Sequence, residues 1–254
     1  MTHHAALFCS YGTALVAWFL IGRLRPGLWP ASDAPRFGRP WKEVAAALIA
    51  GVAVIGMGQL YQRGIRLPSA GPVGFLTESI NQLFIFAPIL LLPALRRQPY
   101  TTAWLPRTRL PERIGCGLGM ALIALLVFST TRTQAAAPWQ ILAALASVEH
   151  VPHLMQVFFE DVAIAILAVR LAAALPRGEW TVPALVGVLF AAGHVPAIIS
   201  GGASVAQVAL LLPDALLGFL VVAVLLRARD VWWFACVHWA LDMMQFERVS
   251  GVAF

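Results

Sequence analysis

Charged residues are scarce in this sequence. Only 12% of its 254 residues are Asp, Glu, Lys or Arg, and Lys42 is the single lysine. Soluble domains carry about a quarter of their residues charged, whereas this chain has 60% hydrophobic residues and a mean hydropathy of +0.79. These values exclude an ordinary soluble protein and indicate an integral membrane protein.

Cysteine is scarce as well, and signals for processing are missing. Cys9, Cys116 and Cys236 are odd in number and far apart, so we expect no disulfide framework. The first apolar stretch lacks a basic leader and a small-residue cleavage motif, and Phe8 argues against lipoprotein cleavage before Cys9. We therefore expect a retained first helix. Since we find no internal repeat or long low-complexity stretch, residues 1–254 are predicted to form a single transmembrane domain.

Long apolar runs are abundant. A hydrocarbon core about 30 Å thick requires about 20 apolar residues per helix, and the sequence offers about eight such stretches. Because runs such as 121–127 and 209–226 are apolar on nearly all faces, they favour helices over the alternating strands of a membrane barrel. The predicted fold is all-α, a polytopic membrane helix bundle with about eight transmembrane helices. The predicted spans are residues 5–22, 43–62, 79–95, 114–131, 153–175, 181–200, 205–226 and 231–248.

The basic residues predict the orientation of the chain. Connections rich in arginine face the cytoplasm, and most basic residues here follow the first, third and seventh predicted spans. Both termini are therefore predicted to face outward. The strong preference for arginine over lysine fits a bacterial genome rich in G and C, so we expect the bacterial cytoplasmic (inner) membrane. The basic residues of these connections are Arg23, Arg25, Arg36, Arg39, Lys42, Arg96, Arg97, Arg107, Arg109, Arg113, Arg227 and Arg229.

The net charge of +6 is mainly this topology signal. The basic connections lack the interleaved aromatic and glycine pattern of a nucleic-acid-binding module, so we expect no nucleic-acid partner. Contact with the anionic lipids of the bilayer is the expected use of these charges. Within the fourth span, Gly115 and Gly119 form a small-xxx-small pair, which predicts a close approach of two helices at these positions.

Ionisable side chains interrupt three of the late apolar stretches. A charged residue at the centre of a membrane helix costs roughly 2.5–3.5 kcal/mol, so such residues usually face a partner or a wet cavity. In the fifth span Glu160 and Asp161 are neighbours about 100° apart around the helix axis, so we expect only one of them, Glu160, to point at a site. His153 lies seven residues before Glu160 on the same stripe, and Gln156 is close to it.

The next two polar positions lie on separate spans. Phe190 and His194 are four residues apart on one face of the sixth span, and Pro196 follows them. In the last span His238 and Asp242 have the i, i+4 spacing that lets a carboxylate orient an imidazole ring. One Glu, two His and one Asp exceed what helix packing requires, so these residues together predict a buried functional site.

These motifs resemble those of a known family. Glu160-Asp161, Phe190-xxx-His194 and His238-xxx-Asp242 are similar, in order and spacing, to the three motifs of the CAAX protease and bacteriocin-processing (CPBP) family of glutamic intramembrane proteases. The resemblance covers residues 150–250 as a family-like catalytic core. It implies hydrolysis of peptide bonds within the membrane by activated water, with catalytic residues Glu160, His194, His238 and Asp242 and supporting residues Asp161, Phe190 and His153.

The chain departs from the family pattern at three positions. The family's first motif commonly has two glutamates and, four residues after the second, an arginine; here these positions hold Asp161 and Ala165. Arg170 is too far along the helix to replace that arginine on the same turn, so another helix supplies a partner or the site works without one. The third motif usually ends in Asn, and an ionised Asp242 cannot donate a hydrogen bond to an oxyanion although it can hold His238.

The expected chemistry needs no nucleophilic Ser or Cys. Glu160 with His194 would take a proton from water as it attacks a peptide carbonyl, and His238 would stabilise the oxyanion or protonate the leaving amine. We expect no cofactor. A zinc site formed by Glu160, His194 and His238 is an alternative, although the chain has no H-E-x-x-H motif.

Functions without catalysis are also open. Paired histidines on membrane helices bind haem b, and intramembrane acids occur in proton-coupled carriers and in immunity-type relatives of proteases. Within the proteolytic prediction, the predicted topology puts Glu160 and His194 in the outward half of the membrane. The expected partner is therefore a membrane-anchored protein or peptide, such as a sorting tail, cleaved near the outer face.

Overall fold

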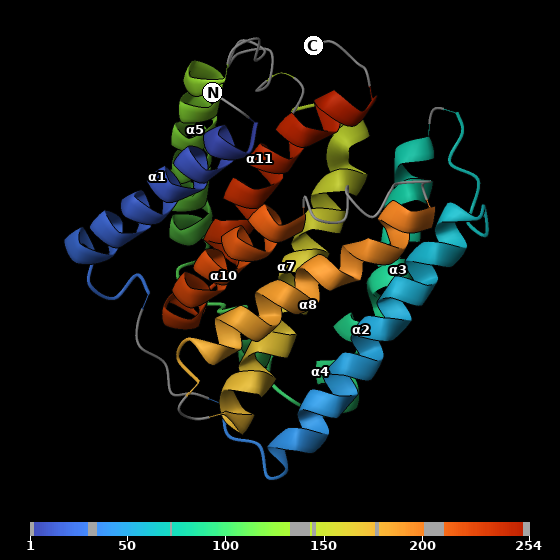
Figure 1. The fold of residues 1–254 in the computed structure, drawn as a ribbon, viewed down its shortest axis with the longest axis horizontal. Helices are drawn as coiled ribbons and strands as arrows, with labels where there is room; N and C mark the ends of the chain where they lie inside the picture. Colours follow the sequence, from blue (N-terminus) through green and yellow to red (C-terminus); the bar gives the residue numbers. More distant parts are fainter. Residues whose placement is uncertain are drawn as a thin grey trace.

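The chain folds into a bundle of long helices. The computed structural model describes residues 3–29, 35–71, 73–132, 143, 146–175, 178–200 and 211–250, without the side chains of 197, 198, 200 and 245–250. Regular structure in this part of the chain is entirely helical, which confirms the predicted all-α class (Figure 1). The long helices are α1 (His3–Leu24), α2 (Pro40–Gln62), α3 (Gly74–Leu90), α5 (Leu110–Thr131), α7 (Val151–Ala174), α8 (Thr181–Ser200), α10 (Leu211–Ala228) and α11 (Trp232–Ser250).

The long helices match the predicted spans. Three of them, α2, α5 and α7, begin with proline in the first turn, where its missing N–H costs no helical hydrogen bond. Residues 205–210 of the seventh predicted span lie outside the described residues. Short helices join the long ones: α4 (Leu92–Leu95), η1 (Tyr100–Ala103) and η2 (Val148–His150).

Five helices of the described chain are long and apolar enough to cross a membrane. They are α1, α2, α3 with α4, α5 and α10, and α8 contains a shorter apolar stretch over Thr181–Pro196. Large apolar side chains such as Ile49, Leu95 and Leu212 are 71–76% exposed on the outside of the bundle. Because lipid solvates such side chains, this outer surface fits an integral membrane protein.

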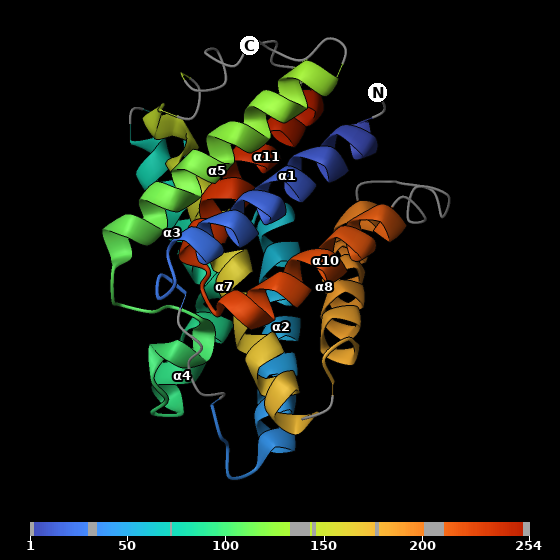
Figure 2. The same cartoon turned by 90° about the vertical axis from the view of Figure 1, so that its left-hand side faces the viewer.

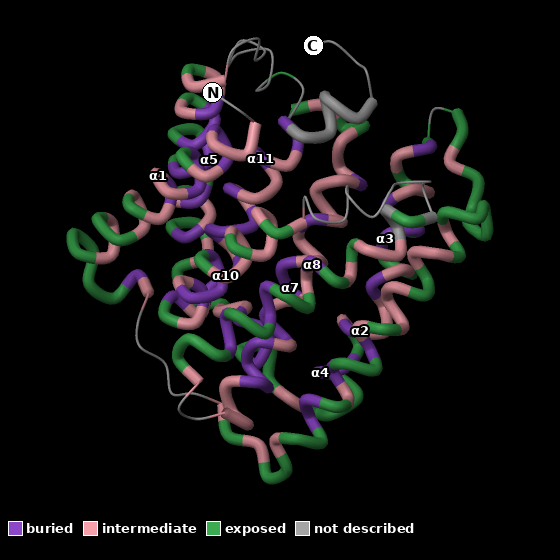
Figure 3. Tube along the Cα trace, in the orientation of Figure 1, coloured by how far each residue is buried: buried purple, intermediate pink, exposed green. Residues whose placement is uncertain are grey.

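The core lies along α5, α7 and α11. α11 packs against α5 and α7, and α1 packs against α5 and also contacts α11 (Figures 1 and 2). On the opposite flank α2 and α3 pack against α7, whereas α8 packs mainly against α10. Buried residues gather on the inner helices, with exposed residues on the outer ones (Figure 3). Trp233, Phe128, Ile166 and Leu241 are each completely buried.

Glycines permit the closest helix contacts. A Cβ added at Gly117 would lie 2.7 Å from the Trp233 Cα, so α5 and α11 touch backbone to backbone there. The prediction for Gly115 and Gly119 is wrong, because a Cβ added at either position meets nothing within 4 Å. The contact falls on the glycine between them. A Cβ at Gly187 would lie 2.7 Å from the Ala215 carbonyl oxygen, which makes α8 and α10 an equally close pair.

A buried ion pair joins three connections at one end of the bundle. Arg113 and Asp230, 1% and 0% exposed, form an ion pair at 2.5 Å. The Trp29 indole donates to the same Asp230 oxygen at 3.0 Å, and the Trp232 indole donates to the Pro106 carbonyl at 3.1 Å. Burial raises the pKa of the Asp230 carboxyl, and the Arg113 guanidinium opposes that shift. The three arginine-rich connections therefore meet at the same end, opposite the start of α1 and the end of α11 (Figure 1).

We predict that Asp230→Asn destabilises the fold strongly. The substitution leaves the Arg113 charge buried without its counter-ion, which costs about 3 kcal/mol of unfolding free energy. Unfolding of the purified protein in mixed micelles measures this change. The double variant Arg113→Met/Asp230→Leu removes both charges and should recover most of the loss. A single variant within about 1 kcal/mol of wild type would contradict this account.

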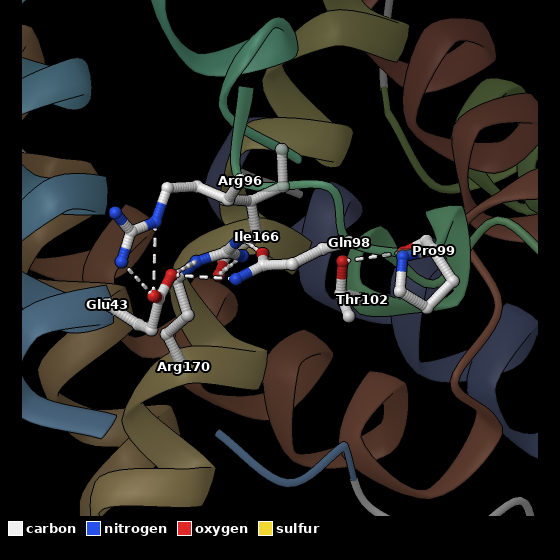
Figure 4. Close-up of polar contacts among 7 residues, drawn as sticks. All are labelled: Glu43, Arg96, Gln98, Pro99, Thr102, Ile166 and Arg170. Atoms are coloured by element: carbon white, nitrogen blue, oxygen red, sulfur yellow. Dashed lines mark hydrogen bonds and ion pairs between the residues drawn. The ribbon is translucent and has the colours of Figure 1, made fainter. Parts of the chain in front are cut away.

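A second polar cluster lies where α2 begins and α7 ends (Figure 4). Glu43 accepts hydrogen bonds from Arg96 and, at 2.8 Å, from Gln98. Arg170 is completely buried, donates to the Ile166 carbonyl at 2.8 Å and to Gln98 at 2.5 Å, and lies 3.9 Å from Glu43. Arg170 therefore links the end of α7 to α2 and to the connection that holds Gln98. It does not take the place of the arginine that the family motif has at the position of Ala165.

Candidate active site

A cavity of about 290 Å³ lies between α7, α8, α10 and α11, with a contribution from α1. Six of the seven residues proposed from the sequence line it, which brings three distant segments of the chain to one place. These six are Glu160, Asp161, Phe190, His194, His238 and Asp242. The seventh, His153, contacts the cavity residue Asp242.

Both acids of α7 line the cavity, whereas the sequence predicted that only one would reach it. Glu160 Oε1 accepts a hydrogen bond from Gln156 Nε2 at 3.0 Å, one turn earlier on the helix. Its other oxygen, Oε2, has no hydrogen-bond partner among the described residues, so one carboxylate oxygen is available to a ligand in the cavity. Asp161 is completely buried against α11.

His238 is paired with Asp161. Its Nδ1 donates to Asp161 Oδ1 at 2.8 Å, and its ring stacks on Phe234 with centroids 5.5 Å apart. Asp161 Oδ2 is buried and has no hydrogen-bond partner within the described chain. A buried acceptor of this kind is rare and calls for a ligand, a water or a proton. The pair fixes the ring so that Nε2 is the ring nitrogen left for other partners.

The described hydrogen bond of His238 crosses to Asp161 of α7 and does not go to Asp242 of its own helix, the partner that the spacing favoured. Asp242 Oδ2 instead lies 3.0 Å from His153 Nε2 on α7. The i, i+4 spacing permits the pair within one helix, but the packing of α7 beside α11 offers each residue a closer partner. Two His–Asp contacts therefore cross between α7 and α11.

His194 lies on the α8 side of the cavity and is exposed. Its Nδ1 is 2.9 Å from the Phe190 carbonyl oxygen. The imidazole ring of His194 and the ring of Phe190 are in edge-to-face contact, with their centroids 4.6 Å apart. Because a carbonyl oxygen only accepts hydrogen bonds, Nδ1 donates in this contact and Nε2 is the ring nitrogen left for other partners. His194 has no direct contact with Glu160 among the described hydrogen bonds.

Two further residues line the cavity. Tyr11 of α1 is 4% exposed, and its ring is tilted relative to that of Phe234, with the centroids 6.3 Å apart. It lines the cavity and was missed from the sequence. A single tyrosine in an apolar helix carries no motif signal, so only the packing of α1 reveals it. Asp214 of α10 adds a fourth carboxyl group to the cavity wall.

No arginine or lysine lines the cavity among the described residues. Ala165, at the position of the family arginine, is completely buried in the helix packing. The hydrogen-bond partner of Asp161 is a histidine from another helix, His238. Of the two possibilities raised by the absence of the family arginine, this arrangement corresponds to the one in which another helix supplies a partner.

The zinc alternative stays a prediction. Within the described part of the chain, no three His, Cys, Asp or Glu side chains are grouped closely enough to hold a metal ion. His194 uses Nδ1 within its own helix, and His238 uses Nδ1 for Asp161, so zinc would have to bind both rings through Nε2.

A second, larger cavity adjoins the first. It measures about 470 Å³, lies between α2, α3, α7 and α8, and is mostly apolar. Gln156, Glu160, Phe190 and His194 line both cavities. Glu160 and His194 therefore lie where the two cavities meet.

No protein-family model, no curated protein and no solved structure matches this chain. The resemblance to CPBP proteases therefore stays a prediction that rests on the motif residues. The geometry described above is independent of that resemblance.

Proposed function

We propose that this protein is an intramembrane endopeptidase that hydrolyses a peptide bond with water activated by Glu160 and His194. The observation that carries the proposal is the meeting of a free Glu160 oxygen, the ring nitrogen Nε2 of His194 and the Asp161–His238 pair in one cavity of a membrane bundle. A cavity of about 290 Å³ has room for a short peptide segment and a water molecule. Packing alone gives no reason to gather four carboxyl groups and two imidazoles there.

The chain's own residues supply each step of the reaction. Glu160 Oε2 accepts a proton from water as the water oxygen bonds to the peptide carbonyl carbon, and His194 Nε2 orients the water. His238, held by Asp161, stabilises the negative charge that develops on the carbonyl oxygen. As the C–N bond breaks, the proton held by Glu160 passes to the leaving amine, and the products are a carboxylic acid and an amine.

A membrane-anchored protein or peptide is the proposed substrate. Glu160 is ten residues, about 15 Å along α7, from the Arg170 cluster at the arginine-rich end. If that end faces the cytoplasm, as the positive-inside rule predicts, cleavage takes place in the interior or outer half of the bilayer. We propose the bacterial cytoplasmic membrane as the location, with a sorting tail as the substrate.

Mass spectrometry of protein termini in the native host tests the proposal. Wild type is compared with Glu160→Gln and His194→Ala, each expressed at the wild-type level. We expect the same membrane-anchored precursor to accumulate in both variants, because each substitution removes one acceptor for the water proton.

Unchanged precursors in both variants would contradict the proposal. A Soret band in the purified protein would then favour haem binding. Without such a band, a role as an immunity-type membrane protein would take precedence. Loss of processing after treatment of membranes with a zinc chelator would instead support the metal-dependent alternative.

A further inference from the structure

The second cavity is a groove that fits an extended peptide. It follows α2 from Ala47 to Gln62, a distance of about 22 Å along the helix axis. An extended chain of about seven residues covers this length. The groove exists because α2 packs against α3 and α7 and hardly touches α8.

The groove changes character along its length. Toward the arginine-rich end its walls are apolar, with Leu48, Val52 and Leu167 among them. Toward the far end they carry the amide side chains of Gln59, Gln62 and Gln82. Gln156 and Glu160 line the groove from α7. An occupant that matches both parts has an apolar segment followed by a polar one.

The glutamines offer open hydrogen-bond acceptors. Gln59 donates to Gln62 at 3.2 Å, Gln82 donates to Glu78 at 3.1 Å, and Gln156 donates to Glu160 at 3.0 Å. In each case the donor's nitrogen is engaged, while its carbonyl oxygen has no hydrogen-bond partner among the described residues. Gln82 is only 8% exposed, so its open acceptor lies in a largely buried wall.

An unwound peptide within a membrane needs such groups. Each backbone N–H or C=O group left unsatisfied in hydrocarbon costs several kcal/mol, so a segment must find partners when it leaves the helical state. A primary amide both donates and accepts, and therefore substitutes for a neighbouring peptide group. Lipid acyl chains have no use for such partners, which favours a peptide as the occupant.

We propose that this groove binds the substrate as an extended segment that spans an apolar-to-polar boundary, with Gln59, Gln82 and Gln156 pairing with its main chain. The apolar part lies toward the arginine-rich end, and the cleaved bond lies beside Glu160. The inference rests on the proposed proteolytic function. It specifies the substrate class as peptides whose hydrophobic segment ends close to the cleaved bond.

Photo-crosslinking in the native host tests the location of the substrate. A benzophenone amino acid replaces Val52 or Leu189 of the groove in the Glu160→Gln protein, and Val16 of the lipid-facing side of α1 serves as the control. We expect the precursor that accumulates in Glu160→Gln to crosslink at both groove positions at least about tenfold more than at Val16, since crosslinking follows occupancy of a site.

Apolar substitutions test the glutamines. In an otherwise wild-type chain, Gln59→Leu and Gln82→Leu should each slow processing of that precursor about fivefold, the effect of losing one hydrogen bond. Thr130→Val removes an exposed polar group from α5, outside the groove, and should leave processing unchanged. Gln59 is only partly buried, so Gln59→Leu tests the role even if Gln82→Leu fails to fold.

The outcomes separate this inference from the proposed function. If no precursor accumulates in Glu160→Gln, the proposed function fails and the inference fails with it. If a precursor accumulates but crosslinks equally at Val52 and Val16, or only lipid is captured at Val52, the groove assignment alone is overturned. A wild-type rate of processing in the Gln59→Leu variant would contradict the assignment of the glutamines to hydrogen bonds with the substrate.

Discussion

Glu160→Gln is expected to lower kcat for the precursor by about 10⁴-fold and to leave KM within about twofold of wild type. The amide keeps the size of the side chain and can remain bonded to Gln156, but it cannot accept a proton from water. Substrate binding in the groove does not depend on that proton transfer. Steady-state cleavage of the precursor by the purified protein in lipid vesicles measures both quantities.

Glu112→Gln is the control for this substitution. Glu112 is an exposed acid of α5 that forms an ion pair with Arg109 and lines neither cavity. Its conversion to glutamine should change kcat less than about threefold. A Glu160→Gln enzyme that retained more than about a tenth of the wild-type kcat would show that Glu160 is not the general base.

His238→Ala is expected to lower kcat by about 10³-fold, with a similar loss for Asp161→Ala. The two side chains act as one unit because Asp161 orients the ring that stabilises the oxyanion. The double variant should therefore lose little more than either single variant, rather than the product of the two losses. Kinetics of the four proteins form a double-mutant cycle that measures this coupling.

His150→Ala serves as the control for loss of a histidine. His150 belongs to η2 and does not line the cavity. Its removal should leave the coupling and kcat unchanged. Additive losses for Asp161→Ala and His238→Ala would contradict the assignment of Asp161 as the residue that positions His238.

The helices could be predicted from the sequence because membrane spans depend on local composition. Continuous apolar runs fix the helical state, since a membrane leaves no other way to satisfy the backbone over such lengths. The close contacts between helices were harder to predict from the sequence. The pair Gly115 and Gly119 matched a known packing pattern, yet Gly117 meets Trp233, because the rotation of α5 about its axis depends on tertiary packing.

The site was predictable as a group of residues but not as a set of contacts. The cost of ionisable residues within apolar stretches pointed to Glu160, His194 and His238 as a group, and the three line one cavity. The partners of the two histidines of α7 and α11 depended on packing between helices. The i, i+4 spacing favoured Asp242 as the hydrogen-bond partner of His238, whereas the partner in the structure is Asp161 of the neighbouring helix α7. The place of Tyr11 in the cavity wall and the groove along α2 could be recognised only from the three-dimensional packing of the helices.

Cleavage of the identified precursor by the purified protein in lipid vesicles tests the central claim most directly. Wild type alone, without any other protein, is expected to produce two fragments whose new termini lie beside the hydrophobic segment of the precursor. Glu160→Gln at the same concentration is expected to produce neither within the same time. Intact precursor with wild type, or equal cleavage by both proteins, would contradict the account of Glu160 as the water-activating base of an intramembrane protease.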